Sequence, residues 1–153
     1  MNSLNNLVLP GERVDDLQFM NLRVIQSPNA FRFGMDAVLL ADFAKPRPSS
    51  RVCDLGTGTG ILPLLLYGRE KTITCDAVEI QPDAAERAQR TMRLNGLERV
   101  ITVHHRDLRE TCSFLPHAAF DLVICNPPYS PSAASLPVPQ LHFARHGRKA
   151  NAR

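Results

Sequence analysis

The chain has 153 residues, of which 44% are hydrophobic, and a formal net charge of +3 at pH 7. This length and composition suit a single domain with a sizeable core. No apolar run is long enough to cross a bilayer, and residues 1–9 lack the basic start and long apolar centre of a signal peptide. We therefore expect a cytoplasmic domain that is neither embedded in a membrane nor secreted.

The first predicted element is a short helix over residues 36–43. Its apolar side chains recur at helical spacing and predict an amphipathic helix: Val38, Leu39, Leu40 and Phe43. The preceding loop, residues 31–34, is expected to fold over the ligand site described below, although core packing is favoured for Phe31 and Phe33 themselves. Residues 45–50 are rich in proline and serine and are expected to form a linker.

Four apolar strands then alternate with two helices. The predicted strands cover residues 51–54, 72–79, 100–105 and 120–125, and the predicted helices cover residues 61–68 and 82–95. Pro82 suits the first turn of a helix, and Asn95-Gly96 suits a helix end. This alternation is typical of an α/β fold with a parallel sheet and right-handed crossovers.

The first of these strands runs into a glycine-rich turn, Asp54-Leu55-Gly56-Thr57-Gly58-Thr59-Gly60, which opens a helix. Such a turn offers free N–H groups and lets a ligand approach the backbone closely. Its G-x-G-x-G spacing differs from the G-x-G-x-x-G of dinucleotide sites and favours a nucleoside with a compact amino-acid tail. Asp54 is expected either to order the turn through its amides or to reach the ammonium of the ligand through water. A turn without a ligand is the alternative.

Acidic residues follow the next two strands. Glu79 ends the second strand, where a carboxylate can accept hydrogen bonds from both hydroxyls of a ribose and repels a 2′-phosphate. Asp107, after the third strand, can accept from the exocyclic amine of an adenine, with the Leu108 N–H near the ring. In isolation, each acid would be a solvated strand end, but together they form one adenosine-shaped site.

The fourth strand ends in Asn126-Pro127-Pro128-Tyr129. The Asn126 side-chain oxygen and the Pro127 carbonyl can accept both N–H groups of a conjugated amine, which favours a pyramidal nitrogen and frees its lone pair. Proline has no N–H, so the turn is biased toward acceptors. Tyr129 can stack on a flat substrate such as a base. A proline-rich loop that only ends a strand is the alternative.

These motifs together resemble class I S-adenosylmethionine-dependent methyltransferases, and the N-P-P-Y form is typical of those that methylate exocyclic or amide nitrogens. The segments at 12–17, 22–28 and 31–43 narrow the resemblance to the tRNA1(Val) adenine-37 N6-methyltransferase family. The resemblance runs from about Glu12 to Tyr129. It implies methyl transfer from S-adenosyl-L-methionine to N6 of an adenine in a tRNA anticodon loop.

The resemblance also implies roles for individual residues. The residues implied to act in catalysis are those of the motif: Asn126, Pro127, Pro128 and Tyr129. The cofactor is held by Asp36, Asp54, Gly56, Thr57, Gly58, Gly60, Glu79, Asp107, Leu108 and Asn126. No general base is evident, and none is needed because the amine proton becomes acidic once the nitrogen is methylated.

The fold implied by the resemblance is Rossmann-like, with strand order 3-2-1-4 in chain order and helices on both faces. Family members continue well past N-P-P-Y, so we expect a C-terminally truncated chain that lacks the second half of the sheet. The expected organisation is an N-terminal segment (1–45) whose helix packs over the cofactor site, a partial cofactor-binding domain (46–129) and a tail (130–153).

The tail is rich in proline and basic. All 15 acidic residues lie at or before Asp121, whereas four basic residues follow it: Arg145, Arg148, Lys149 and Arg153. Such a tail can bind RNA phosphates, but a solvated end without regular structure is the simpler expectation. A second basic cluster belongs to the helix predicted at 82–95 and is expected to be mostly solvated: Arg87, Arg90, Arg93 and Arg99.

Cysteine and histidine patterns argue against a metal. The four cysteines, Cys53, Cys75, Cys112 and Cys125, show no C-x-x-C spacing, and all but Cys112 fall inside predicted strands. Buried free thiols are therefore expected in place of disulfides or zinc ligands. The neighbours His104 and His105 match no metal-ligand pattern either.

Three other functions remain open. Glutamine N5-methylation of release factors uses the same N-P-P-Y chemistry but resembles a different N-terminal domain. DNA adenine methylation is expected to need a target-recognition region that is not evident here. A fragment that binds the cofactor weakly or not at all, without catalysis, is the third. A nicotinamide dehydrogenase is disfavoured by the glycine spacing, and the oligomeric state stays open.

Overall fold

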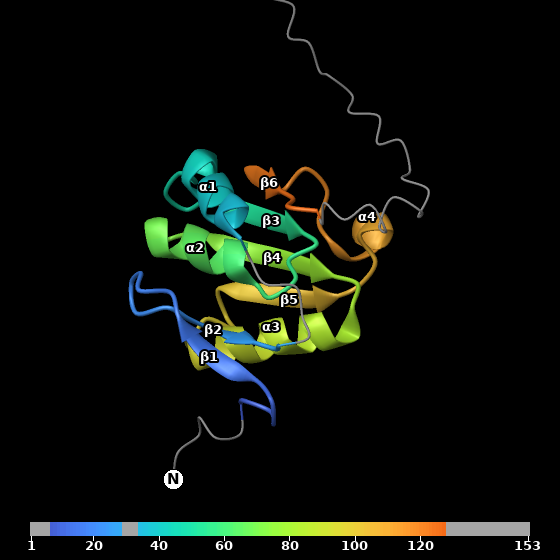
Figure 1. The fold of residues 1–153 in the computed structure, drawn as a ribbon. Helices are drawn as coiled ribbons and strands as arrows, with labels where there is room; N and C mark the ends of the chain where they lie inside the picture. Colours follow the sequence, from blue (N-terminus) through green and yellow to red (C-terminus); the bar gives the residue numbers. More distant parts are fainter. Residues whose placement is uncertain (1–6, 29–33, 128–153) are drawn as a thin grey trace, which may run out of the picture.

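A computed structural model describes residues 7–28 and 34–127 (Figure 1). The elements in chain order are β1 (Arg13–Asp16), β2 (Arg23–Gln26), α1 (Met35–Ala44), β3 (Arg51–Leu55), α2 (Ile61–Arg69), β4 (Thr74–Glu79), α3 (Pro82–Leu94), β5 (Ile101–His105), the 3-10 helix η2 (Leu108–Glu110), α4 (Thr111–Phe114) and β6 (Leu122–Ile124). The four strands and two helices predicted after the linker are confirmed.

The main sheet is parallel and has the order β5-β4-β3-β6. This is the predicted order 3-2-1-4, counted over these four strands. β3 is central, with β4 on one side and β6 on the other. The free edge of β6 carries no partner strand within residues 7–28 and 34–127.

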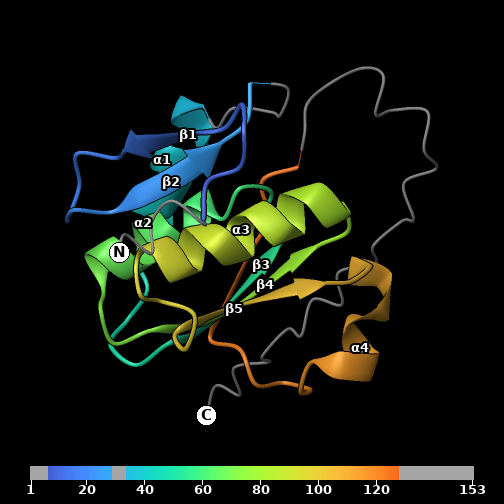
Figure 2. The same ribbon diagram turned by 90° about the horizontal axis from the view of Figure 1, so that it is seen from below.

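The helices divide between the two faces of the sheet (Figure 2). α2 and α3 connect β3 to β4 and β4 to β5, so right-handed crossovers place both on the same face. α1 packs beside α2 on that face, and the short α4 lies on the opposite face. Seven of the nine residues of α2 are buried, including Leu64 and Leu66, and this helix is the centre of the core.

An antiparallel hairpin of β1 and β2 forms a further layer over α3, away from the sheet (Figure 2). Side chains of α3 pair with the backbone of β2: Thr91 accepts from the Ile25 N–H at 3.1 Å, and Asn95 bonds both the N–H and the C=O of Arg23. A step of four residues along a helix, about 6 Å, nearly matches two along a strand, about 6.8 Å. The helix thus satisfies the outer edge of β2, which the sequence did not predict.

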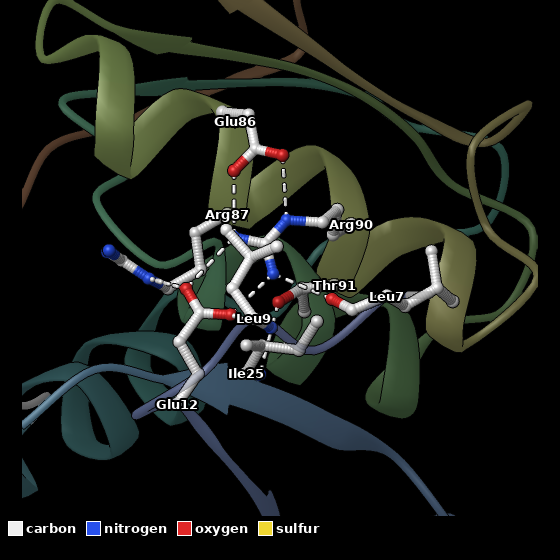
Figure 3. A network of polar contacts seen from close by, with 8 residues as sticks. All are labelled: Leu7, Leu9, Glu12, Ile25, Glu86, Arg87, Arg90 and Thr91. Atoms are coloured by element: carbon white, nitrogen blue, oxygen red, sulfur yellow. Dashed lines mark hydrogen bonds and ion pairs between the residues drawn. The ribbon is translucent and has the colours of Figure 1, made fainter. Parts of the chain in front are cut away.

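A buried ion-pair network fixes the chain before β1 to α3 (Figure 3). The Arg90 guanidinium donates to both oxygens of Glu12, to both oxygens of Glu86 and to the Leu7 carbonyl. Arg87 donates to Glu12 at 3.0 Å. The prediction of a mostly solvated arginine face is wrong for Arg90, which is only 5% exposed, and for the half-buried Arg87. Glu86 is one helical turn from Arg90, but Glu12 and Leu7 lie 75–83 residues away from their arginine partners, beyond any local pattern.

Two expectations about burial are also wrong. In α1 the buried side chains are Ala37 and Ala41, whereas Leu39 and Phe43 are 63% and 85% exposed. Cys53 and Cys75 are buried as predicted, but Cys125 is exposed, because it follows a strand that has a neighbour on one side only in the described part of the chain. No helix in that part is long and apolar enough to span a bilayer. The predicted tail and the loop 31–33 lie outside the described residues.

Glu12→Gln is expected to lower the free energy of unfolding by about 3 kcal/mol, because it removes a countercharge from the buried Arg90. The control Arg93→Gln changes an exposed arginine of the same helix and is expected to cost less than about 0.5 kcal/mol. Urea unfolding at pH 7 measures both. Equal effects of the two substitutions would contradict the assigned role of the network.

The same pair predicts acid sensitivity. The hydrogen bonds from Arg90 lower the pKa of Glu12 from 4.5 to about 2, so its stabilisation is complete above pH 4.5 and is lost as the pH falls toward 2. The stability of the wild-type protein is therefore expected to fall more steeply between pH 5 and pH 3 than that of Glu12→Gln. Parallel curves from urea unfolding across this range would rule out this contribution.

Candidate functional site

The sheet register brings the predicted site residues to one edge. Asp54 pairs with Ile124 of β6, and Leu55 pairs with Val78 of β4. Continuing these registers by one or two positions sets Asn126, Gly56 and Glu79 in one row, with neighbouring strands about 4.8 Å apart. The motifs separated by up to seventy residues in sequence therefore meet at the carboxyl ends of the strands, where open α/β sheets bind ligands.

The glycine turn is held by β4, not by Asp54. The amides of Gly56 and Thr57 both donate to the Val78 carbonyl, at 2.8 and 3.0 Å, and the Gly58 amide donates to Glu79 Oε2 at 2.8 Å. The first of the two roles predicted for Asp54, ordering the turn through these amides, is therefore not seen. A Cβ added at Gly56 or Gly58 would meet no neighbour within 4 Å among the described residues, which leave open space over both positions.

Gly60 has a different role from the other two glycines of the turn. It has a φ of +81°, and a Cβ there would lie 2.5 Å from the Met92 side chain and 3.5 Å from Ala88. Glycine at this position therefore lets α2 begin against α3, which is a packing role that the motif alone did not reveal. Its predicted contact with a cofactor stays a prediction.

Asp54 is completely buried beneath the turn. Neither carboxyl oxygen, nor the Thr57 hydroxyl nearby, makes a hydrogen bond of good geometry within the described residues. Burial raises the pKa of Asp54 to about 7; the approach of the Thr57 hydroxyl lowers it and the charge of Glu79 raises it further. An unpaired buried carboxyl is costly, and a cationic donor would compensate it.

Glu79 is 7% exposed and accepts two backbone hydrogen bonds, from Gly58 and from Gln81 at 2.9 Å. A carboxylate has about four acceptor positions, so two remain for a ligand. The hydrogen bonds fix the orientation of the carboxylate at the strand end. Glu79 is therefore oriented as an acceptor at the end of β4, and its contact with a ribose stays a prediction.

A shallow hollow, open to solvent, lies beside Glu79. Its lining comes from the ends of β3, β4 and β5: Gly56, Val78, Glu79, Ile80, Arg106, Asp107 and Leu108. Ile80 and Leu108 are 57% and 41% exposed and offer apolar walls for a flat ring. The sequence reasoning missed Ile80, although an apolar residue directly after the acid of a strand end is a readable signal.

Asp107 lies in this hollow but is engaged by a neighbour. Its oxygens accept from the Arg109 backbone N–H at 2.9 Å and from the Arg109 guanidinium, which lowers the pKa of Asp107. The Arg109 side chain is 71% exposed, and such exposed pairs are weak. The acceptor role predicted for Asp107 toward an adenine therefore requires a ligand to share or displace Arg109.

Asn126 and Asp36 meet although ninety residues separate them. The Asn126 Nδ2 group donates to Asp36 Oδ2 at 2.7 Å, which joins the tip of β6 to the first turn of α1. Asn126 is half-buried and Pro127 is exposed. Pro128 and Tyr129 of the predicted motif lie outside the described residues.

Comparison with known proteins agrees with this geometry. Residues 16–145 match the family described as the methyltransferase small domain. The chain belongs to this family. A tRNA1(Val) (adenine(37)-N6)-methyltransferase of Citrobacter koseri is 35% identical over 137 residues, which are 88% of this chain and 55% of that protein. The methyltransferase chain therefore spans about half the length of the curated relatives it matches.

Solved structures agree on the fold. TrmN from Thermus thermophilus is 26% identical, with a TM-score of 0.54 over 64% of this chain and 29% of that chain. A precorrin-6y C5,15-methyltransferase from Geobacter metallireducens is 13% identical, with a TM-score of 0.56 over 65% of this chain and 52% of that chain. The sheet order β5-β4-β3-β6 is that of class I methyltransferases, as predicted.

The methyltransferase fold implies binding of S-adenosyl-L-methionine, and the described residues fit such a ligand. The unpaired buried carboxyl of Asp54 suits an ammonium group, Gly56 and Gly58 leave the turn open, and the hollow beside Glu79 has apolar walls and oriented acceptors. Within residues 7–28 and 34–127, no cluster of three or more His, Cys, Asp or Glu side chains suits a metal ion.

The buried carboxyl of Asp54 predicts that the free energy of unfolding changes with pH in the opposite direction to the change predicted for Glu12. Because the pKa of Asp54 is raised from 3.8 to about 7, the folded state holds the proton more tightly, and stability falls as the pH rises from 4 through 7. Relative to Asp54→Asn, which does not titrate, wild type is expected to lose about 3 kcal/mol between pH 5 and pH 8. Urea unfolding at both pH values measures the difference. A constant difference would exclude the raised pKa.

Proposed function

We propose that the protein transfers a methyl group from S-adenosyl-L-methionine to an exocyclic amine, namely adenine N6 in a tRNA anticodon loop. The observation that carries the proposal is the register that aligns Asn126, followed by Pro127, with the open glycine turn and the unpaired carboxyl of Asp54. The amine acceptors and the hollow beside Glu79 then lie at the same sheet edge.

Different residues of the turn and the hollow bind different parts of the cofactor in this proposal. Asp54 and Thr57 would compensate the ammonium, Gly56 and Gly58 would leave room for the methionine part, and Glu79 would accept from the ribose hydroxyls. Ile80, Leu108 and Asp107, which line the hollow, would hold the adenine. When bound, the cofactor supplies a sulfonium whose methyl group is transferred and whose thioether is a good leaving group.

Asn126 and Pro127 act on the target amine. The side-chain oxygen of one and the carbonyl of the other accept its two N–H groups and direct the nitrogen lone pair to the methyl carbon. A nitrogen–carbon bond forms as the carbon–sulfur bond breaks, and one amine proton then leaves to solvent. Since the chain contributes positioning and acceptors, no general base is required. Tyr129 is proposed to stack on the flipped-out base.

The choice of tRNA is supported by the curated relatives, whose printed name specifies adenine 37 of tRNA1(Val). The identity of 35% supports the reaction and the class of substrate. Because the chain spans about half of those proteins, the tRNA species and the activity itself are parts of the proposal.

A second candidate function is cofactor binding without methyl transfer. One observation favours it: β6, which carries Asn126, has a partner strand on one side only in the described part of the chain, and its Val123 is 56% exposed. A strand supported on one side holds its tip less firmly than a central strand does, and positioning is the main source of acceleration in this reaction.

Transfer of labelled methyl groups to unmodified tRNA tests the first function. Wild type is expected to label tRNA and not a release factor, and Asn126→Ala to lower kcat by about 100-fold, because one acceptor for the amine is lost. Arg99→Gln, on the exposed surface after α3, is the control and is expected to retain full activity. Labelling of a release factor alone would favour glutamine N5-methylation.

Calorimetric titration with S-adenosylhomocysteine separates the two functions. Wild type is expected to bind, and Gly58→Val to lose at least about tenfold in affinity, because Gly58 has a φ of +57° and its side chain would enter the open space over the turn. Binding without transfer to tRNA would select the second function. Absence of binding by wild type would exclude both.

A further inference from the structure

The structure assigns a partner to the asparagine of the N-P-P-Y motif. The Asn126 Nδ2 group donates to Asp36 Oδ2 at 2.7 Å across ninety residues of sequence. Asp36 lies in the first turn of α1, where an acidic side chain is favoured by the helix dipole. The hydrogen bond therefore ties the amide to a charge whose own position is set by a helix.

A carboxamide has two different ends. Its oxygen accepts hydrogen bonds and its NH₂ group donates them, so a rotation by 180° about the last side-chain bond exchanges an acceptor for a donor. An amine substrate needs the acceptor, and the wrong orientation would set N–H against N–H. Because an ionised carboxylate only accepts, Asp36 can face only the NH₂ end of Asn126, and the oxygen is turned to the other side.

Gly34 gives independent support. A Cβ at this position would lie 2.6 Å from Asp36 Oδ1 and 3.7 Å from the carboxyl carbon, the two contacts within 4 Å that the described residues make there beyond the chain neighbours. Its φ of −107° is open to any residue, so the backbone conformation does not demand glycine. The missing side chain instead leaves the space in which the Asp36 carboxylate reaches Asn126.

We propose that Asp36 is a positioning residue for methyl transfer, which sets the Asn126 carboxamide with its oxygen toward the target amine, and that Gly34 leaves room for it. The effect of Asp36 on methyl transfer rests on the proposed function. It assigns Asp36 a role toward the acceptor substrate, in place of the cofactor contact predicted from the sequence.

Three variants test the proposal by methyl transfer to tRNA. Asp36→Ala is expected to lower kcat about 100-fold while the affinity for S-adenosylhomocysteine changes less than threefold, because the target amine meets a disordered acceptor. Asp36→Asn keeps an acceptor oxygen without the charge and is expected to lose about tenfold. Gly34→Ala keeps Asp36 but displaces its carboxylate, and is expected to resemble Asp36→Ala.

Asp42→Ala is the matched control. It removes an exposed acid of the same helix whose partner Arg69 is 3.6 Å away, and it is expected to leave kcat unchanged. Thermal melting of each variant separates loss of folding from loss of positioning. If Asp36→Ala lost stability but the folded protein kept the wild-type kcat, the role would be structural and the proposal overturned.

A measurement that does not use activity follows the amide itself. In protein labelled with ¹⁵N at asparagine, the side-chain NH₂ signals of Asn126, assigned by comparison with Asn126→Ala, are expected to be shifted and slow to exchange in wild type. They should revert toward free-amide values in Asp36→Ala and Gly34→Ala. Unchanged signals would overturn the inference, whereas reverted signals in a protein that labels no tRNA would defeat only the proposed function.

Discussion

The parallel register of β3 with its two neighbours is the constraint on which the site depends. Because β3 lies between β4 and β6, the residues that follow all three strands emerge at the same edge and at the same height. The glycine turn, the acid of β4 and the asparagine after β6 need no loop to bring them together. A slip of one residue in either pairing would turn every side chain of that strand to the opposite face and dissolve the site.

Much of this arrangement could be predicted from the sequence, since its signals are local. An apolar run before Gly56 and another before Asn126 predict strands, and alternation with helices predicts a parallel sheet. The pairing of Arg90 with Glu12 could not be predicted, because Glu12 lies on a segment with no helical or strand period shared with α3. The exposure of Phe43 was missed for a related reason: periodicity shows that a helix has an apolar stripe, not that another element covers it.

One part of the site is fixed by backbone hydrogen bonds, and another part lowers the stability of the fold. Backbone hydrogen bonds from the turn to Val78 and Glu79 set the geometry before any ligand is bound. Asp54, in contrast, is buried without a hydrogen bond of its own in the described residues, and its raised pKa records the cost. Under the proposed function, the ammonium of the cofactor would compensate this group, and the stability lost at Asp54 would contribute to the affinity for the ligand.

The outer side of β6 has a consequence for handling the protein in solution. Backbone N–H and C=O groups along an open strand edge are a template for pairing with another chain, and here Met35, Leu39 and Phe43 form an exposed apolar stripe on α1 as well as the exposed Val123 of β6. Few charges stand on these positions to discourage contact. Where these described residues stay uncovered, they would favour self-association at high concentration, which mild detergent or Val123→Lys would weaken.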